Sequence, residues 1–443
     1  MIRFEDQQLT SFSGLLIFQL LFKHLKLKQQ IKKCFSHLKT SPIFGRHLIV
    51  LLIIVHLLIG FRRLREVDYY RDDPIVLRLM GLRKLPDVST ISRALAQMEP
   101  EGVDNVRRLS RSIVIKGLQR ERLPRLTLDF DGSVQSTKGY VEGTAVGFNK
   151  AKKGARSYYP LFCTVAQTGQ FFDLHHRPGN VHDSNGAQRF MSNCLSKAKA
   201  QFPGTALESR MDSAFFSENI ISTFNSKYVK FTASVPFERL TQLKEMIESR
   251  KRWRKIDSQW SYFEASWKPK SWGTCYRFIF TRKKTRKQHK GMLQLHLFEP
   301  RDFDFDYKVI VTNKTESAKS VVLFHNGRGS QEKIFGDAKN DAALNVVPSK
   351  RLAGNQLFTL CSMMAHNLSR EVQMLASPGA VSRTLPKRPA AWVFEKLDTL
   401  RHRIIQRAGR FTRPQGKLTL TMSANQAVRQ DLLHFLDVLQ KAA

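Results

Sequence analysis

The spacing of the hydrophobic residues changes at residue 126, and this change limits the folds that are open to the chain. Before this point apolar residues recur at helical spacing. In the segment RLTLDFDGSV, which begins at Arg125, they alternate with polar residues instead, as in a half-buried β-strand. One face of that strand is apolar, and the other carries Asp129 and Asp131. The chain is therefore predicted to combine a helical region with a region that contains a sheet.

Strands and helices are predicted to alternate up to residue 235. They are strands over 158–166 and 170–178, a helix over about 185–200, a strand that ends on Asp212, a helix near 217–226 and a strand over 227–235. Gly169 lies in the turn of the first hairpin. This order matches the ribonuclease-H-like fold, a mixed sheet flanked by helices. Such a sheet presents catalytic groups at strand ends and on a following helix, so we expect an α+β multidomain chain.

The region before the sheet, residues 1–120, is predicted to be a helical DNA-binding region. Its most apolar run, HLIVLLIIVHLLIG at 47–60, is shorter than the ~20 residues that span a membrane, and we interpret it as a buried helix. In LRKLPDVSTISRALAQM, Ser89 or Thr90 can cap a short helix. That helix exposes Arg93 near its start, as the recognition helix of a helix-turn-helix does. Simple packing in a helical bundle explains the pattern equally well.

After residue 235 the alternation is interrupted. The segment 236–306 is predicted to be a β-rich basic insertion, and it holds four of the five tryptophans. Aromatic rings between cations suit nucleic-acid contact, although the same rings could form the core of a small subdomain. The run RKKTRKQHK, which contains Lys283, Lys284 and Arg286, is predicted to be a loop that faces DNA phosphates.

The chain is then predicted to return to its catalytic domain, whose two parts are 121–235 and 307–375. YKVIVTN predicts a buried strand, followed by two helices, the second of which holds Glu332, and by an apolar helix over about 354–375. The last region, 376–443, is predicted to be basic and helical. Its Lys and Arg residues suit either contact with DNA or a solvated helix.

The charge of the chain narrows the choice of partner. Lys and Arg number 73 against 37 Asp and Glu, a formal net charge of +36. This excess favours nucleic acid, whose phosphates bind such surfaces, over the competing partner, an anionic membrane. The start MIRFEDQQLT predicts no signal peptide. The five cysteines lack CxxC spacing, which supports neither disulfides nor zinc and fits a reducing cytosol.

Three acidic residues stand in separate settings that suit metal binding. Asp131 lies near the end of a strand, Asp212 follows a strand in MDSAF, and Glu332 lies on a helix. Cleavage of a phosphodiester needs an activated attacking oxygen and a stabilised leaving oxygen, and two divalent ions can supply both. Mg²⁺ prefers oxygen ligands, so two aspartates and a glutamate can hold such a pair. Asp129 shares the strand face of Asp131 and is the rival first ligand, or else a residue that supports the site.

Glu332 belongs to a set with helical spacing. His325, Arg328, Glu332 and Lys339 follow one another at intervals of three, four and seven residues, which places all four along one face of a helix. In the functional interpretation Glu332 binds metal, and its neighbours hold DNA phosphates. The alternative is a solvated stripe with an Arg–Glu pair.

Taken together, these blocks resemble the DDE transposases of bacterial insertion sequences. DGS after an apolar strand matches the first-aspartate motif of that family, MDSAF matches the second, and R-x3-E-x6-K matches the third block. The site residues that the resemblance implies are Asp131 (rather than Asp129), Asp212, Arg328, Glu332 and Lys339. The family often has tyrosine where this chain has His325, which leaves the role of that position open.

Four further blocks, DDP, LPDVSTISR, SYYPLF and RPGN–HDSNGA, resemble insertion-sequence family 1380 in particular. The resemblance covers about residues 15–420 and implies cut-and-paste transposition of an element with terminal inverted repeats. It implies two Mg²⁺ ions, with Mn²⁺ as a substitute, and double-stranded DNA as transposon end and target. It also implies a homodimer on DNA in the bacterial cytoplasm, associated with the nucleoid, with no membrane or small-molecule partner.

Two questions stay open at the level of sequence. Relatives with such an insertion can pass through a DNA hairpin in which an aromatic ring holds a flipped base. The candidates for that ring are Trp260, Trp267, Trp272, Phe303 and Tyr307. The competing function is that of a DNA-binding regulator derived from a transposase, without catalysis, and the intact acidic triad argues against it.

Overall fold

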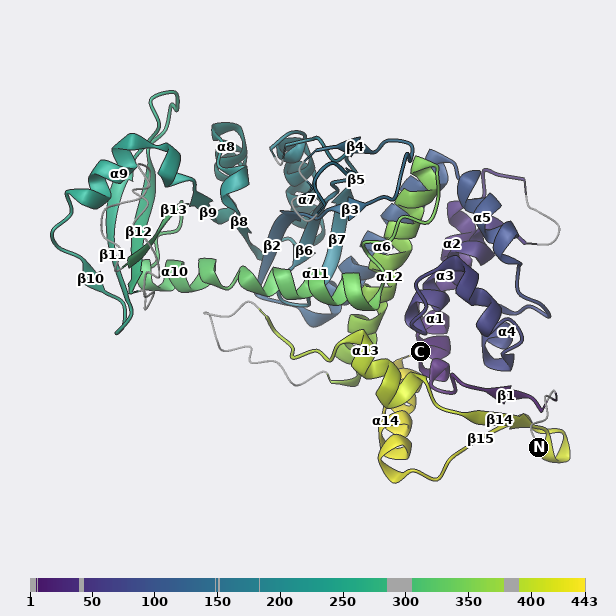
Figure 1. Cartoon of the computed structure of the whole chain (residues 1–443). Helices are drawn as coiled ribbons and strands as arrows, with labels where there is room; N and C mark the ends of the chain where they lie inside the picture. The colour runs from purple at the N-terminus through teal and green to yellow at the C-terminus, as the bar shows by residue number, and fades with distance from the viewer. Residues whose placement is uncertain are drawn as a thin grey trace, which may run out of the picture.

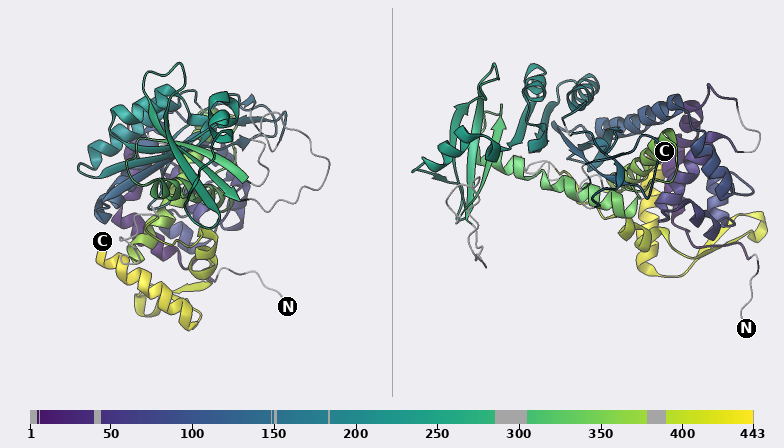
Figure 2. Two further views of the ribbon diagram at one scale, coloured as in Figure 1. Left: turned by 90° about the vertical axis from the view of Figure 1, so that its left-hand side faces the viewer. Right: turned by 45° about the horizontal axis from the view of Figure 1, so that its top comes forward.

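The computed structural model describes residue 5 and residues 7–39, 44–147, 149, 152–182, 184–284, 305–377 and 390–442. The molecule is elongated (Figure 1). The N-terminal helices lie at one end, and the strands of the insertion lie at the other. The right-hand view of Figure 2 shows the same separation from another side.

A nine-stranded mixed sheet runs along this axis. Its strands, in spatial order, are β10 (Arg254–Lys255), β11 (Trp260–Trp267), β12 (Tyr276–Lys284), β13 (Phe305–Thr312), β9 (Lys230–Val235), β8 (Ala206–Met211), β2 (Arg125–Gly132), β6 (Leu161–Val165) and β7 (Gln170–His175). Strand β8 is parallel to both β2 and β9, and every other pair is antiparallel. The insertion therefore extends the edge of the main sheet, because β13 pairs with β9 on one side and with β12 on the other.

One face of the sheet is apolar and packs against helices. The core on this side joins apolar side chains of the strands to α7 (Ala187–Gln201), α8 (Glu218–Ser226), α9 (Thr241–Glu248) and the end of α6 (Pro100–Glu121). Burying alternate apolar residues of each strand in this way is the main force that holds the sheet.

The other face is covered by two helices that follow one another nearly end to end (Figure 1). They are α10 (Ala318–Asn326) and α11 (Gly329–Asp341), and α12 (Leu352–Ala376) follows. Only a small apolar cluster joins α10 to β12 and β13, through residues such as Ile279, Ile310 and Val321. At the other edge of this face, Phe162 of β6 packs against Phe335 of α11. The strands between these two apolar contacts, β9, β8 and β2, present polar side chains and carry the site described below.

The N-terminal region is helical, as predicted. Its helices are α1 (Leu15–His24), α2 (Leu27–Cys34), α3 (Arg46–Leu58), α4 (Pro74–Met80), α5 (Val88–Ala96) and α6. All residues of α3 from Leu48 to Leu58 are buried, and α3 packs against α12. The apolar run is thus a buried helix, and none of the described helices has the length and apolar character that a membrane crossing requires.

The C-terminal region is only partly helical, contrary to the prediction. It contains α13 (Leu397–Leu400) and α14 (Gln426–Ala442), but also β14 (Gly409–Thr412) and β15 (Thr419–Met422). These two strands form a sheet with β1 (Leu9–Thr10) near the other end of the chain. A strand near the N-terminus supplies the partner, and local sequence could not indicate this. A third small sheet joins β3 (Gln135–Ser136), β5 (Arg156–Tyr158) and β4 (Ala145–Val146).

Most elements predicted for the catalytic region lie within a few residues of their observed bounds. Gly169 has φ +61°, a conformation that suits glycine, in the turn between β6 and β7. The predicted strand over 158–166 is divided in two, because β5 ends before Pro160 and pairs outside the main sheet. Helix α5 begins at Val88, so Asp87 occupies the N-cap position instead of the predicted Ser89 or Thr90.

Candidate active site

The centre of the sheet face beneath α10 and α11 is a buried polar layer. Parallel pairing of β2 with β8 sets Thr127 opposite Glu208 and Asp129 opposite Arg210. All four side chains are buried. Buried charges are stable only when they are paired, and here the strand register pairs an acid with a base.

Asp129 is held in this layer by an ion pair and is not available as a metal ligand. Its two carboxylate oxygens accept hydrogen bonds from Nε and Nη2 of Arg210, the first at 2.9 Å. Both side chains are completely buried. The guanidinium also donates to the carbonyl oxygen of Phe324, near the end of α10, at 3.3 Å. The rival first ligand is thus excluded by its ion pair, and Arg210 links two strands to the helix above them.

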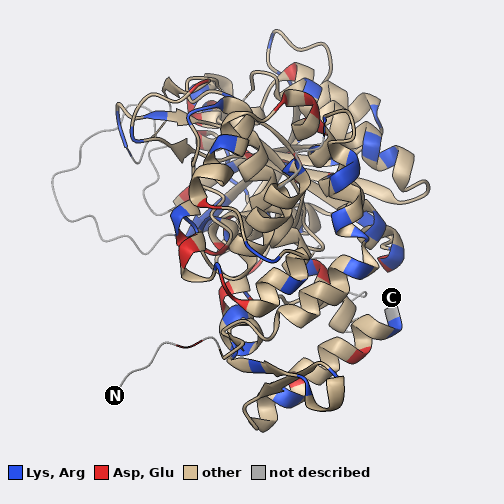
Figure 3. Cartoon of the chain, turned by 90° about the vertical axis from the view of Figure 1, so that its right-hand side faces the viewer, with Lys and Arg blue, Asp and Glu red and all other residues tan. Residues whose placement is uncertain are grey.

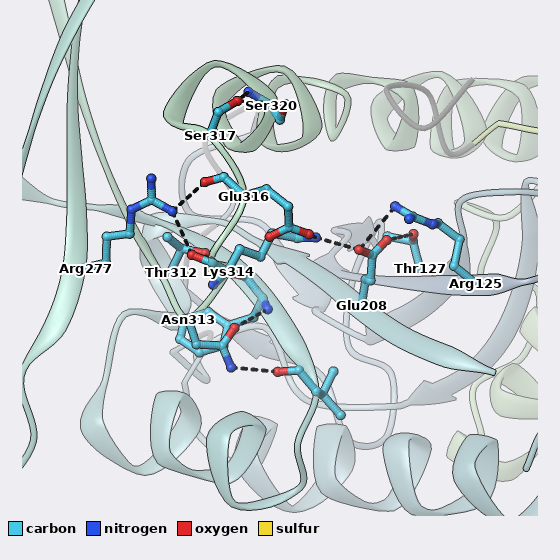
Figure 4. Close-up of polar contacts among 12 residues, drawn as sticks. Arg125, Thr127, Glu208, Arg277, Thr312, Asn313, Lys314, Glu316, Ser317 and Ser320 are labelled. Carbon is cyan, nitrogen blue, oxygen red and sulfur yellow. Dashed lines mark hydrogen bonds and ion pairs between the residues drawn. The ribbon is translucent and has the colours of Figure 1, made fainter. Parts of the chain in front are cut away.

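A second buried network lies beside the first (Figure 4). Lys314, in the loop that leads into α10, donates to Glu208 at 2.5 Å, and Arg125 approaches the same carboxylate at 3.5 Å. Arg277 of β12 donates to the backbone oxygens of Lys314 and Glu316. These contacts fix the start of α10, as the Arg210 contact fixes its end.

Asp131 and Asp212 leave the buried layer at the ends of their strands. Asp131 is the residue before the last of β2, and Asp212 follows β8 directly. Asp212 caps a single helical turn (Ser213–Phe215), whose first amide donates to its carboxylate at 2.5 Å. Both carboxylates are partly exposed, with 25% and 44% of their side-chain surfaces accessible.

Arg328 brings these two aspartates together. Its Nη1 lies 3.4 Å from Oδ2 of Asp131, and its Nη2 lies 3.0 Å from Oδ2 of Asp212. One planar guanidinium therefore touches carboxylates from two separate strands. The structure thus brings Asp131 and Asp212 together at one cation.

Arg328 lies at a junction between helices rather than within one helix. Helix α10 ends at Asn326, α11 begins at Gly329, and the backbone turns between them through a bond from the Arg328 amide to His325. The intervening Gly327 is tightly packed, since a Cβ there would lie 2.6 Å from Nη1 of Arg210. The predicted single helical face is therefore wrong for His325, which belongs to the preceding helix.

His325 does not face solvent, and its predicted contact with DNA has to be corrected. It is 1% exposed, and its two ring nitrogens lie 2.9 Å from the hydroxyls of Thr232 and Ser234 on β9. Burial, with the nearby cations Lys308, Arg328 and Arg210, holds the pKa of the ring well below its usual value. A neutral histidine here bonds α10 to the sheet, and this explains why a polar residue occupies the position.

Glu332 and Lys339 lie on α11. Glu332 is exposed in the first turn, where a carboxylate interacts favourably with the helix dipole. Lys339 is half-buried. Burial lowers the pKa of its ammonium, and the Asp131 carboxylate acts in the opposite direction.

A cavity of about 480 Å³ opens between these elements. Its lining includes Asp212, Glu332, Arg328, Lys308 and Arg239. Glu332 thus shares a cavity with one aspartate and with the arginine that holds both aspartates. Within the part of the chain that the structure describes, no three His, Cys, Asp or Glu side chains lie close enough together to hold one metal ion as they stand.

The residues predicted to contact DNA outside this site occupy two distant places. Arg93 is exposed on α5 and lines a cavity of about 940 Å³ together with Lys32, Lys33 and Arg46. Lys283 and Lys284 end β12, and Arg286 lies outside the described residues. Figure 3 shows Lys and Arg spread over the helices at the N-terminal end.

The aromatic residues of the insertion mostly pack against one another. Trp272 is buried against Phe216, and Trp267 packs against Phe278. Trp260 is half-buried on β11, with the Lys283 ammonium 5.8 Å from its ring centre. The other candidates are Tyr307, which is half-buried, and Phe303, which lies outside the described residues.

Sequence reasoning missed three residues of this site: Arg210, Gly327 and Lys308. The sequence did contain a signal for Lys308, because it is the one charged residue in the otherwise uncharged strand YKVIVTN. Arg210 was indicated only by its place in a strand next to an acidic strand. Gly327 gave no signal before the helix junction was known.

Comparison with known proteins supports one family. The model of the family described as transposase DDE domain group 1 matches residues 1–443. Among solved structures, the chain is similar to the piggyBac transposase synaptic complex with hairpin DNA, with 11% identity over 88% of this chain and 79% of that one and a TM-score of 0.45. Two Mos1 complexes, one with the left transposon end and one with Mn, each have 11% identity over 44% of this chain and 60% of theirs, with a TM-score of 0.18. No curated protein matches.

The match to the family model covers the whole chain, whereas the similarities to solved structures are too remote to add to it. Cutting and transferring DNA suits the strongly basic composition of the chain, because cationic side chains bind phosphates. The chain belongs to the DDE transposases, enzymes that use divalent metal ions to cut DNA and transfer the cut ends.

Proposed function

We propose that this transposase cuts and pastes an insertion sequence, with Asp131, Asp212 and Glu332 as its metal-binding triad. The observation that carries the proposal is that carboxylates from β2 and β8 reach the same guanidinium, at 3.4 Å and 3.0 Å. Carboxylates held at one place repel each other unless a cation offsets their charge, and in the structure Arg328 is that cation. The strand order from β7 to β9 and the pairing of these strands support a ribonuclease-H-like catalytic domain.

The residues at the site fit a divalent metal. The donors that face it are carboxylate oxygens, which Mg²⁺ prefers, and Glu332 lines the same cavity as Asp212. When bound, Mg²⁺ would activate the attacking oxygen and stabilise the leaving oxygen of the phosphodiester. We propose two Mg²⁺ ions, for which Mn²⁺ can substitute.

The cationic residues around the triad have a separate task. Arg328 is only 16% exposed and can donate two parallel hydrogen bonds, a geometry that suits phosphate as well as carboxylate. Lys339 lies on α11, the helix that carries Glu332, and its ammonium interacts electrostatically with Asp131. Both are proposed to hold phosphates beside the scissile bond, so that the reacting atoms are aligned before cleavage.

We further propose that the N-terminal helices and the insertion bind the inverted repeats at the ends of an element of family 1380. Arg93 on α5 and Lys283 and Lys284 on β12 are the residues that we assign to this contact. The two places lie at opposite ends of the molecule (Figure 2), so one chain can reach well-separated parts of a DNA duplex. Joining two ends requires at least a homodimer on DNA.

The triad can be tested with single substitutions. Asp131→Asn, Asp212→Asn and Glu332→Gln are each expected to reduce DNA cleavage by more than ~1,000-fold, because each removes a charged metal ligand. DNA binding should be kept or become tighter, since each variant also removes a negative charge. The assay follows cleavage of a duplex taken from the DNA that flanks the coding sequence, in Mg²⁺ and in EDTA.

Asp104→Asn serves as the matched control, because Asp104 is an exposed carboxylate on α6, away from the cavity. It is expected to cleave like the wild type. Cleavage by the triad variants at the rate of this control would show that the assignment is wrong.

A further inference from the structure

Lys308 enters the active-site cavity from the strand that precedes the helix junction. It lies on β13, and its side chain lines the cavity together with Asp212, Arg328 and Glu332. Ile310, two residues later on the same strand, packs beneath α10. Because side chains two residues apart share one face of a strand, Lys308 lies on the polar face of the sheet that carries the triad.

The pairing of β13 determines where Lys308 lies along that face. β13 runs antiparallel to β9, and the last pair joins Val309 to Val235 at the carboxyl end of β9. Lys308 lies one residue beyond this pair. It is therefore beside the carboxyl end of β9, next to the end of β8, from which Asp212 projects.

The ammonium of Lys308 is unpaired within the part of the chain that the structure describes. Among the described residues it forms no hydrogen bond or ion pair, although the side chain is half-buried. Burial lowers its pKa, the Arg328 guanidinium lowers it further, and the Asp212 carboxylate acts in the opposite direction. A partly desolvated cation without a partner is unfavourable unless a ligand supplies the missing anion.

The surroundings favour one class of anion. Lys308, Arg328 and Arg239 place three cations around the cavity, beside the carboxylates of Asp212 and Glu332. Two of these cations are held by the fold, on a strand and at a helix junction, and Arg239 is exposed at the rim. A phosphodiester has two free oxygens that can face such cations while the phosphorus faces the carboxylate side.

We propose that Lys308 contacts the substrate directly, by donating a hydrogen bond to a free oxygen of the DNA phosphodiester that is cut. This rests on the proposed function and adds a residue to it. Negative charge on these oxygens must be stabilised as the attacking oxygen approaches, and a fixed ammonium in a partly desolvated site stabilises it strongly. Lys308 stays protonated throughout and transfers no proton.

The first test measures DNA binding in EDTA and does not depend on cleavage. The variants are Lys308→Met, which keeps the apolar stem, and Lys308→Arg, which keeps the charge. Lys230→Met is the control, because Lys230 is an exposed lysine at the opposite end of β9. A lost phosphate contact reduces the slope of log K against log salt by about 0.9. We expect this reduction for Lys308→Met alone.

The second test measures single-turnover cleavage at saturating DNA in Mg²⁺. Lys308→Met should cut about 100-fold more slowly, Lys308→Arg should recover most of the rate, and Lys230→Met should match the wild type. Urea denaturation of each variant separates a folding defect from a lost contact, and Lys308→Gln replaces Lys308→Met if the latter is unstable.

The outcomes separate the two proposals. If the wild type cleaves and Lys308→Met matches it in rate and in salt slope, the role of Lys308 is overturned and the proposed function stands. If the wild type does not cleave, the proposed function fails, and the salt slope still decides whether Lys308 binds a phosphate. A slope for Lys230→Met that falls as far as that for Lys308→Met would also overturn the assignment.

Discussion

Arg210→Met is expected to lower the free energy of unfolding by about 3–5 kcal/mol, because it leaves the Asp129 carboxylate buried without a partner. The pair is completely buried, so water cannot replace the lost guanidinium. The variant also loses the hydrogen bond to the Phe324 carbonyl. Urea denaturation followed by circular dichroism measures the change.

The double variant Asp129→Leu/Arg210→Met isolates the ion pair. It removes both charges. Replacing a buried ion pair by apolar side chains of similar size often leaves the free energy of unfolding unchanged. We therefore expect it to be more stable than Arg210→Met alone. Lys441→Met is the matched control, since its pair with Asp437 is largely exposed and contributes at most about 0.5 kcal/mol. Equal losses for the control and for Arg210→Met would contradict the role that we give to burial.

The Asp129–Arg210 pair also affects the position of Arg328 in the active site. Arg210 holds the end of α10, and Arg328 lies two residues after the last residue of that helix. Methionine cannot donate a hydrogen bond to the Phe324 carbonyl. The double variant can therefore regain stability while it still lacks the contact that holds the end of α10. It should therefore fold yet cut DNA more slowly than the wild type, which separates the stability of the sheet from the placement of Arg328.

Unfolding is expected to become much easier as the pH falls from 7 to 5. Three histidines have depressed pKa values, mainly because burial of the ring disfavours its charged form: about 4 for His56 and about 3 for His176 and His366. His325 is shifted in the same direction. Each ring stays neutral in the folded protein at pH 5, whereas it becomes charged in the unfolded chain below its ordinary pKa of 6.5.

The direction of this pH dependence follows from the number of protons that the folded and unfolded states bind. Between pH 6.5 and 4 the unfolded state binds more protons than the folded state, so stability falls with falling pH by up to about 1.4 kcal/mol per pH unit for each histidine. For the three with stated values the loss between pH 7 and pH 5 is about 6 kcal/mol. This is comparable to the whole stability of many domains, which is about 5–15 kcal/mol. Urea denaturation at several pH values measures it.

Single histidine variants provide the control. His366 bonds to the Gly169 carbonyl through Nε2, and in His366→Asn the group that titrates is gone. Its stability should therefore depend less steeply on pH, by about one proton, even if it is less stable at pH 7. His402 is largely exposed, and His402→Asn should leave the slope unchanged. An unchanged slope for His366→Asn would show that this ring does not titrate on unfolding.

The sequence by itself determined the order and type of most elements and the three acidic settings. These depend on local causes: the alternation RLTLDFDG, a glycine turn at Gly169 and apolar helical runs. Each acts over a few residues and can be interpreted without knowing what packs against it. The same local signals placed Asp131 and Asp212 at the ends of strands.

Only the tertiary structure showed that Asp129 is completely buried in an ion pair, whereas Asp131 is partly exposed at the end of its strand. The parallel register of β2 and β8 sets Arg210 opposite Asp129, 81 residues away in the chain, and the buried ion pair removes that acid from the site. The antiparallel register of β13 and β9 likewise brings Lys308 to the cavity. Register between distant strands depends on packing across the whole sheet, and a single strand does not carry that information.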